Sequence, residues 1–207
     1  MMQKTAPAGD FSLENLEKAL DSALGAPASP AQGAFVAAVL EDFRPGELDG
    51  VTPADLAEVL AGFWKFAKSH HGQAPTVRLI RARGAGERDL MLDLLEIVQP
   101  DAPFLVDSVM GEVSESGAEV RAMFHPMVEE GRAETSMIQV WLAPVGEERR
   151  AGLIERVLAA MADVHAAVTD FPAMLKLLGE CIAGLERDAP KLRHGAEAIA
   201  EDLAFLR

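Results

Sequence analysis

Apolar residues recur at helical spacing along the first part of the chain. This spacing predicts helices over 11–24 and 31–43. A third helix is expected to begin after Thr52, because Thr52 can cap it and Pro53 suits the first helical position. Asp55, three residues after the cap, completes the pattern of a capping box. The chain is therefore expected to start with three helices.

The period of the pattern changes to alternation after residue 75. Strands are expected over 76–82, 90–98, 118–128 and 136–145. The second of these is an apolar run of strand length, although Asp93 and Glu96 interrupt its period. Gly131 is expected in the connection of a hairpin between the last two strands.

Two further stretches have helical spacing. One covers 103–117, with Asp101 as its expected cap, Pro103 in its first turn and Phe104 expected to be buried against the sheet. A long helical stretch follows the last strand, Pro172 is expected to kink or restart it, and Pro190 begins a last helix.

This order of elements predicts an α+β fold. The unit from 90 to about 169 is β-α-β-β-α, the order of a ferredoxin-like sandwich without its last strand, and the strand 76–82 can supply that strand at the edge. We expect an antiparallel sheet with helices on one face, flanked by N-terminal and C-terminal helices. The expected boundaries are 1–72 for an N-terminal helical segment, 73–170 for the α+β domain and 171–207 for a C-terminal helical segment.

The last predicted strand assigns side chains to the two faces of the sheet. Its alternation turns Ile138, Val140 and Leu142 toward the helices of the sandwich. Met123, Met137 and Trp141 are then expected on the opposite face. Two explanations stay open for so apolar a face: the N-terminal or C-terminal helices cover it, or it is a contact surface between copies or with other domains.

Composition narrows the class of protein. The 207 residues carry a formal net charge of −14, which argues against binding to nucleic acids or to an anionic membrane surface. The single cysteine cannot form an internal disulfide, and the chain has neither a secretory signal nor an apolar run long enough to span a membrane. A cytoplasmic protein is expected.

Few residues are candidates for chemistry. No dinucleotide fingerprint, P-loop or metalloprotease motif occurs, so the chain itself is expected to hold no cofactor, no metal and no catalytic site. The segment 99–109 allows two interpretations of Asp101, Asp107 and Ser108: a capped helix packed on the sheet, or a helix N-terminus that receives an anionic effector. His125 is either a structural residue at the end of a strand or a ligand-binding residue.

These residues carry a resemblance to a known family. PDAPFLVDSV at 100–109, followed after one helix by VRAMFHP at 120–126, resembles the N-terminal region of the large bacterial NAD-specific glutamate dehydrogenases. The stretches 60–80, 154–178 and 200–207 are also similar to that region. The chain departs from the family at Gln99-Pro100-Asp101 and in its very short hairpin after Pro126.

The resemblance implies an ACT-like module, a type that binds amino acids or pairs with itself to regulate an attached enzyme. The parent enzyme would deaminate L-glutamate to 2-oxoglutarate and ammonia with NAD, through residues far downstream in the family. The expected partners are downstream domains of the same polypeptide, a second copy of the chain, with Met137 and Trp141 as candidates at that contact, and an amino-acid effector. The apolar end at 204–207 favours a piece of a longer chain, and the alternative is a free-standing ACT-like module for amino-acid sensing or oligomerisation.

Overall fold

The computed structural model describes residues 11–25, 29–44, 46–72, 74–130, 133–188 and 204–205. The chain forms two compact units, Met1–Val164 and His165–Arg207. The elements of the described residues are α1 (Leu13–Leu24), α2 (Pro30–Asp42), α3 (Pro53–Lys68), β1 (Thr76–Arg83), the short 3₁₀ helix η1 (Ala85–Glu87), β2 (Asp89–Pro100), α4 (Leu105–Glu115), β3 (Val120–Phe124), β4 (Met127–Glu130), β5 (Ala133–Leu142) and α5 (Glu147–Asp188).

One antiparallel sheet forms the centre of the first unit. Its strands follow the order β1-β2-β5-β3. Strand β4 also pairs with β5, along residues 133–136, whereas β3 pairs with residues 139–142. The predicted α+β fold is confirmed, and β1 pairs with β2 at the edge, as expected for 76–82. The predicted strand 118–128 is two strands, separated at His125 and Pro126. Pro126 has no N–H to donate, so the ladder is interrupted there.

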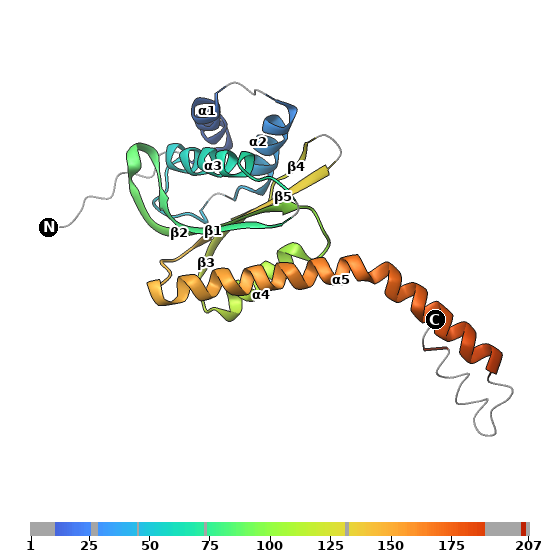
Figure 1. Ribbon diagram of the computed structural model, residues 1–207. Helices are drawn as coiled ribbons and strands as arrows, with labels where there is room; N and C mark the ends of the chain where they lie inside the picture. The colour runs from blue at the N-terminus through green and yellow to red at the C-terminus, as the bar shows by residue number, and fades with distance from the viewer. Residues whose placement is uncertain are drawn as a thin grey trace. The chain divides into compact units, whose positions relative to one another are not determined.

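Helices cover both faces of this sheet (Figure 1). Helices α1, α2 and α3 lie on one side, and α4 lies with the part of α5 up to Val164 on the other. Met137 and Trp141 are fully buried in a core that they share with Phe35 and Phe63 of the N-terminal helices. Of the two explanations for this apolar face, cover by the N-terminal helices is therefore the correct one. Neither Met137 nor Trp141 is exposed to a second copy.

Strand pairing corrects one assignment to a face. Met123 lies opposite Val140 in the ladder between β3 and β5, and Ala122 lies opposite Trp141. Opposed residues of an antiparallel pair share a face, so Met123 is on the side of Val140 and not with Trp141. Alternation within each strand does not say which residues of two strands lie opposite each other, so the sequence could not assign Met123 to its face.

The N-terminus of α3 is attached to the turn between β1 and β2. Thr52 and Asp55 form the expected capping box, and the Asp55 carboxylate also accepts hydrogen bonds from Arg88 and from the backbone N–H of Ala85. Burial alone would raise the pKa of Asp55, but hydrogen bonds from Arg88 and Thr52 outweigh it and hold the pKa below 3.8. Gly84 packs so closely on Asp55 that an added Cβ would overlap this carboxylate.

Helix α5 continues as one element past Val164 into the second unit. Pro172 lies inside this one helix, so the alternative that a new helix starts at Pro172 is wrong. The predicted helix from Pro190 lies outside the described residues, apart from Ala204 and Phe205.

Candidate functional site

A pocket of about 170 Å³ lies where β2 ends and α4 begins. It is lined by Asp101, Ala102, Phe104, Leu105, Val106, Asp107 and His125. Three of the residues singled out from the sequence, Asp101, Asp107 and His125, thus meet in one place. They come together because the break between β3 and β4 brings His125 beside the loop that leads into α4.

Phe104 has a different position from the one expected. Its ring is 71% exposed, and its backbone is left-handed with φ 68°, a conformation that costs a residue other than glycine free energy. The helix begins at Leu105, so Asp101 and Pro103 lie outside its first turn. Phe104 occupies the N-cap position, and its side chain makes no capping hydrogen bond. The prediction of a buried Phe104 and a cap at Asp101 is wrong.

The uncapped start of α4 gives the pocket a donor side. The first backbone N–H groups of a helix have no partner within the helix and carry the positive end of its dipole. Asp101 and Asp107 place two exposed carboxylates at the same pocket. A small molecule that bears both an ammonium and a carboxylate group matches this combination of acceptors and donors.

His125 is fixed by two hydrogen bonds. Its backbone N–H donates to the Asp42 carboxylate at 2.8 Å, and its Nε2 lies 2.8 Å from the Ser136 hydroxyl. Burial lowers the pKa of His125 below 6.5, although the charges of Asp42 and Asp101 act in the opposite direction. Burial thus favours the neutral form of the imidazole, and the hydrogen bond with Ser136 orients the ring beside the pocket.

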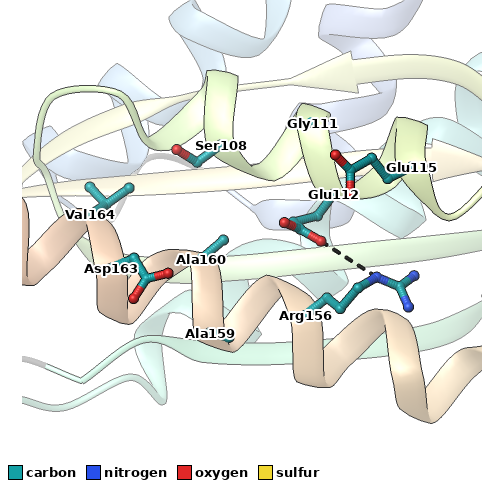
Figure 2. A pocket seen from close by; sticks show the side chains of 9 residues that line it. All are labelled: Ser108, Gly111, Glu112, Glu115, Arg156, Ala159, Ala160, Asp163 and Val164. Atoms are coloured by element: carbon teal, nitrogen blue, oxygen red, sulfur yellow. Dashed lines mark ion pairs between the residues drawn. The ribbon is translucent and has the colours of Figure 1, made fainter.

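Ser108 lies in a second hollow, a groove between α4 and α5 (Figure 2). Glu112, Glu115 and Asp163 supply carboxylates to this groove, and Arg156 forms an ion pair with Glu112 at 3.4 Å. Ser108 thus lies on a different surface from Asp101 and Asp107, although the sequence analysis grouped the three residues together.

A row of hydrogen-bonded polar side chains lies on the face of the sheet that α1, α2 and α3 cover. The carboxylate of Glu96 accepts hydrogen bonds from Arg78 Nε at 2.5 Å and from Gln139 Nε2 at 2.7 Å, and Trp141 Nε1 donates to Gln139 at 2.9 Å. The guanidinium of Arg78 also lies 3.9 Å from the centre of the Phe66 ring. Burial raises the pKa of Glu96 above 4.5, against the pull of Arg78 and Gln139.

Asp93 attaches the opposite face of the same strand to α5. Its Oδ2 accepts hydrogen bonds from the backbone N–H of Val145 at 2.7 Å and from Arg150 at 2.8 Å. Arg150 also donates to the carbonyl oxygen of Leu79 in β1, at 2.8 Å. The carboxylate therefore fixes the start of the helix to the sheet.

Sequence reasoning did not assign a role to Asp93 or Glu96. The available signal was the presence of two carboxylates inside an otherwise apolar strand, because a charged group buried in a sheet requires a partner. Their partners Gln139 and Arg150 lie far away in the sequence, so only the fold reveals them.

The described part of the chain offers neither a metal site nor a membrane span. Across the ranges given above, no group of three or more His, Cys, Asp and Glu residues is placed to hold a metal ion. Of the helices that the structure describes, none has the length and hydropathy needed to cross a membrane.

Comparison with known proteins assigns the fold. Residues 35–171 match the family described as glutamate dehydrogenase, ACT1 domain, which is more than half of the chain. The chain belongs to this family. The resemblance found at PFLVDS and FHP thus falls within the matched region of the glutamate dehydrogenase ACT1 family.

A curated relative extends this match. The chain is 27% identical over 200 residues to the NAD-specific glutamate dehydrogenase of Halomonas elongata, an alignment that covers 86% of this chain. It covers 12% of that protein, so the chain spans about an eighth of the relative's length.

Proposed function

We propose that this chain is a regulatory and assembly module of an NAD-specific glutamate dehydrogenase. In this role it contributes no catalytic group, and a downstream part of the same polypeptide oxidises L-glutamate with NAD to 2-oxoglutarate and ammonia. The observation that carries the proposal is the family match over residues 35–171, on a sheet with the strand order of an ACT-like fold. The dinucleotide-binding fingerprint is missing from the sequence, which agrees with a role outside the reaction itself.

The pocket at the start of α4 is the proposed effector site. A free amino acid would place its ammonium group against Asp101 and Asp107, and its carboxylate at the N–H groups of the first turn of α4. Phe104 keeps a strained backbone and an exposed ring at the mouth of this pocket, where the ring can cover a bound side chain.

Titration calorimetry of the 207-residue chain tests the effector site. One of the twenty common amino acids is expected to bind with one-to-one stoichiometry, and Asp107→Asn is expected to weaken that binding at least tenfold. Glu115→Gln is the matched control, because it removes a carboxylate from the same helix but from the groove of Figure 2. Failure of every amino acid to bind would reject the effector site.

The place in a larger enzyme is tested separately. The same titration with NAD is expected to show no binding, and micromolar binding would contradict a non-catalytic module. The genomic reading frame is expected to continue into dinucleotide-binding and glutamate-binding domains. A stop codon directly after Arg207 would instead favour a free-standing amino-acid sensor.

A further inference from the structure

The end of α3 places a histidine between the helix and the sheet. The helix ends at Lys68, and in the turn that follows the His70 N–H donates to the carbonyl oxygen of Ala67 at 3.0 Å. The turn brings the ring of His70 to the start of β1, where Nδ1 lies 2.8 Å from the Thr76 hydroxyl. One of the two ring nitrogens of His70 therefore has its partner in the sheet.

The other ring nitrogen of His70 is buried and unpaired. Among the described residues, no donor or acceptor lies within hydrogen-bond distance of Nε2, and the atom is shielded from the surrounding solvent. Leaving a buried polar atom unpaired costs free energy, so such atoms are nearly always bonded to a protein group or to ordered water. A partner for Nε2 is therefore expected.

A small cavity adjoins the ring of His70. It has a volume of about 40 Å³ and lies between the end of α3 and the strands β4 and β5. Thr135 adds a hydroxyl group to its lining, and most of the other lining side chains are apolar, among them Trp64 and Met137. Thr76, the partner of Nδ1, is not part of the lining, so the cavity adjoins another edge of the ring. The unpaired nitrogen and the cavity thus belong to the same side chain.

The size and the chemistry of the cavity favour water as its occupant. One water requires roughly 10–15 Å³ of such space, so the cavity accepts one water or a few, but no metabolite. Water both donates and accepts hydrogen bonds, so it matches Nε2 in either tautomer of His70 and matches the Thr135 hydroxyl as well. No carboxylate lines the cavity, and the ammonium group of Lys68 lies 5.8 Å from the centre of the Trp64 ring. A metal cation would therefore find no counter-charge.

We propose that one ordered water molecule in this cavity bridges His70 Nε2 and the Thr135 hydroxyl. His70 then connects the end of α3 to two strands, to β1 directly through Thr76 and to β5 through the water. Strand β2 lies between β1 and β5, so the bridge joins two strands that do not pair with each other. The water site goes beyond the regulatory role proposed above and depends neither on the pocket at α4 nor on an attached enzyme.

Two matched threonine variants test the bridge in crystals of the 207-residue chain. The parent is expected to show a water oxygen within about 3.2 Å of both His70 Nε2 and the Thr135 hydroxyl oxygen. Thr135→Val keeps nearly the same shape but removes one partner of the water, so this variant is expected to lose the water. Thr76→Val is the control: it removes the partner of Nδ1 and leaves both partners of the water, so it is expected to keep the water.

A measurement in solution repeats the comparison without a crystal. Oxygen-17 magnetic relaxation dispersion reports long-lived internal waters, and its amplitude is expected to fall in Thr135→Val and to stay unchanged in Thr76→Val. Far-ultraviolet circular dichroism of equal intensity confirms that both variants are folded. Equal amplitudes in the parent and in Thr135→Val would overturn the proposal.

The crystals also distinguish water from the alternatives. A direct hydrogen bond between Nε2 and a protein group would overturn the proposal, because the nitrogen would then need no water. Crystals soaked in sodium bromide are expected to show no anomalous signal in the cavity. A bromide peak beside Nε2 would overturn the proposal as well, because it would identify the site as one for a small anion.

Discussion

Glu96 is a buried carboxylate whose environment makes stability depend on pH. Because burial raises its pKa above 4.5, the folded state keeps the proton over a range in which the unfolded state has lost it. The free energy of unfolding therefore loses a contribution as pH rises from about 4.5 through the raised pKa. We expect Glu96→Gln to remove this part of the pH dependence, measured as urea midpoints at a series of pH values. Glu115→Gln, on the surface, is expected to keep it.

His125 contributes a pH dependence of the opposite sign. Its pKa lies below 6.5 in the folded state because the ring is partly buried, so the unfolded state binds a proton first as the pH falls. The free energy of unfolding is expected to decrease as pH falls from 6.5 through the lowered pKa.

Thermal melts of His125→Gln measure this contribution. The variant is expected to lose stability less steeply than the parent over that range, whereas the exposed His165→Gln is expected to follow the parent. Identical pH profiles for the parent and His125→Gln would show that the ring titrates alike in both states.

Single residues also show what the sequence could reveal of the site. The sequence alone identified three candidates: Asp101, Asp107 and His125. They are polar residues near the start of a helix and at the end of a strand, where loops often meet. Their meeting in one pocket, and the separation of Ser108 from them, depend on the pairing of β3 and β4 with β5. The exposure of Phe104 follows from a left-handed backbone that its apolar side chain gives no reason to expect.

Among the elements, α4 offers a direct test of how it begins. Phe104→Gly removes an exposed ring and relieves the strain of a left-handed backbone, which stabilises the folded state by about 1 kcal/mol. The greater conformational freedom of glycine in the unfolded chain offsets this gain by a similar amount. The melting temperature is expected to stay nearly unchanged. Leu105→Ala, one residue later and 3% exposed, is the control and is expected to cost about 2–5 kcal/mol. Equal losses for the two variants would mean that the ring of Phe104 is buried.

The elements themselves were largely predictable because their signals are local. Thr52, Pro53 and Asp55 marked the start of α3, and the spacing of apolar residues defined the described helices and strands. The boundaries that failed depend on backbone geometry: the start of α4 at Leu105 and the division of one predicted strand at His125 and Pro126. Both lie at the pocket, where the local pattern is least regular.

At the scale of the whole chain, the N-terminal helices and the sheet depend on each other. They share one core that contains Trp141 and Met137. We expect a chain shortened to 73–207, the predicted boundary, to lose its fixed tertiary structure, because this face of the sheet would be exposed to water.

The fluorescence of Trp141 reports this outcome. Trp64 is absent from the shortened chain, so full-length Trp64→Phe is the control in which Trp141 is again the single tryptophan. Emission from the shortened chain is expected at longer wavelength than from the control. Equal emission would show that the sheet folds without α1, α2 and α3.

Strand β2 carries one carboxylate for each layer of helices: Glu96 faces the side of α1, α2 and α3, and Asp93 faces α5. A shift of the strand by one residue would turn both side chains to the opposite face. Glu96 would lose Arg78 and Gln139, and Asp93 would lose Arg150, at about 3–5 kcal/mol for each buried charge left alone. The two acids that interrupt the apolar pattern of β2 thus help to specify the register of the strand, because a shift by one residue leaves both of them without their partners.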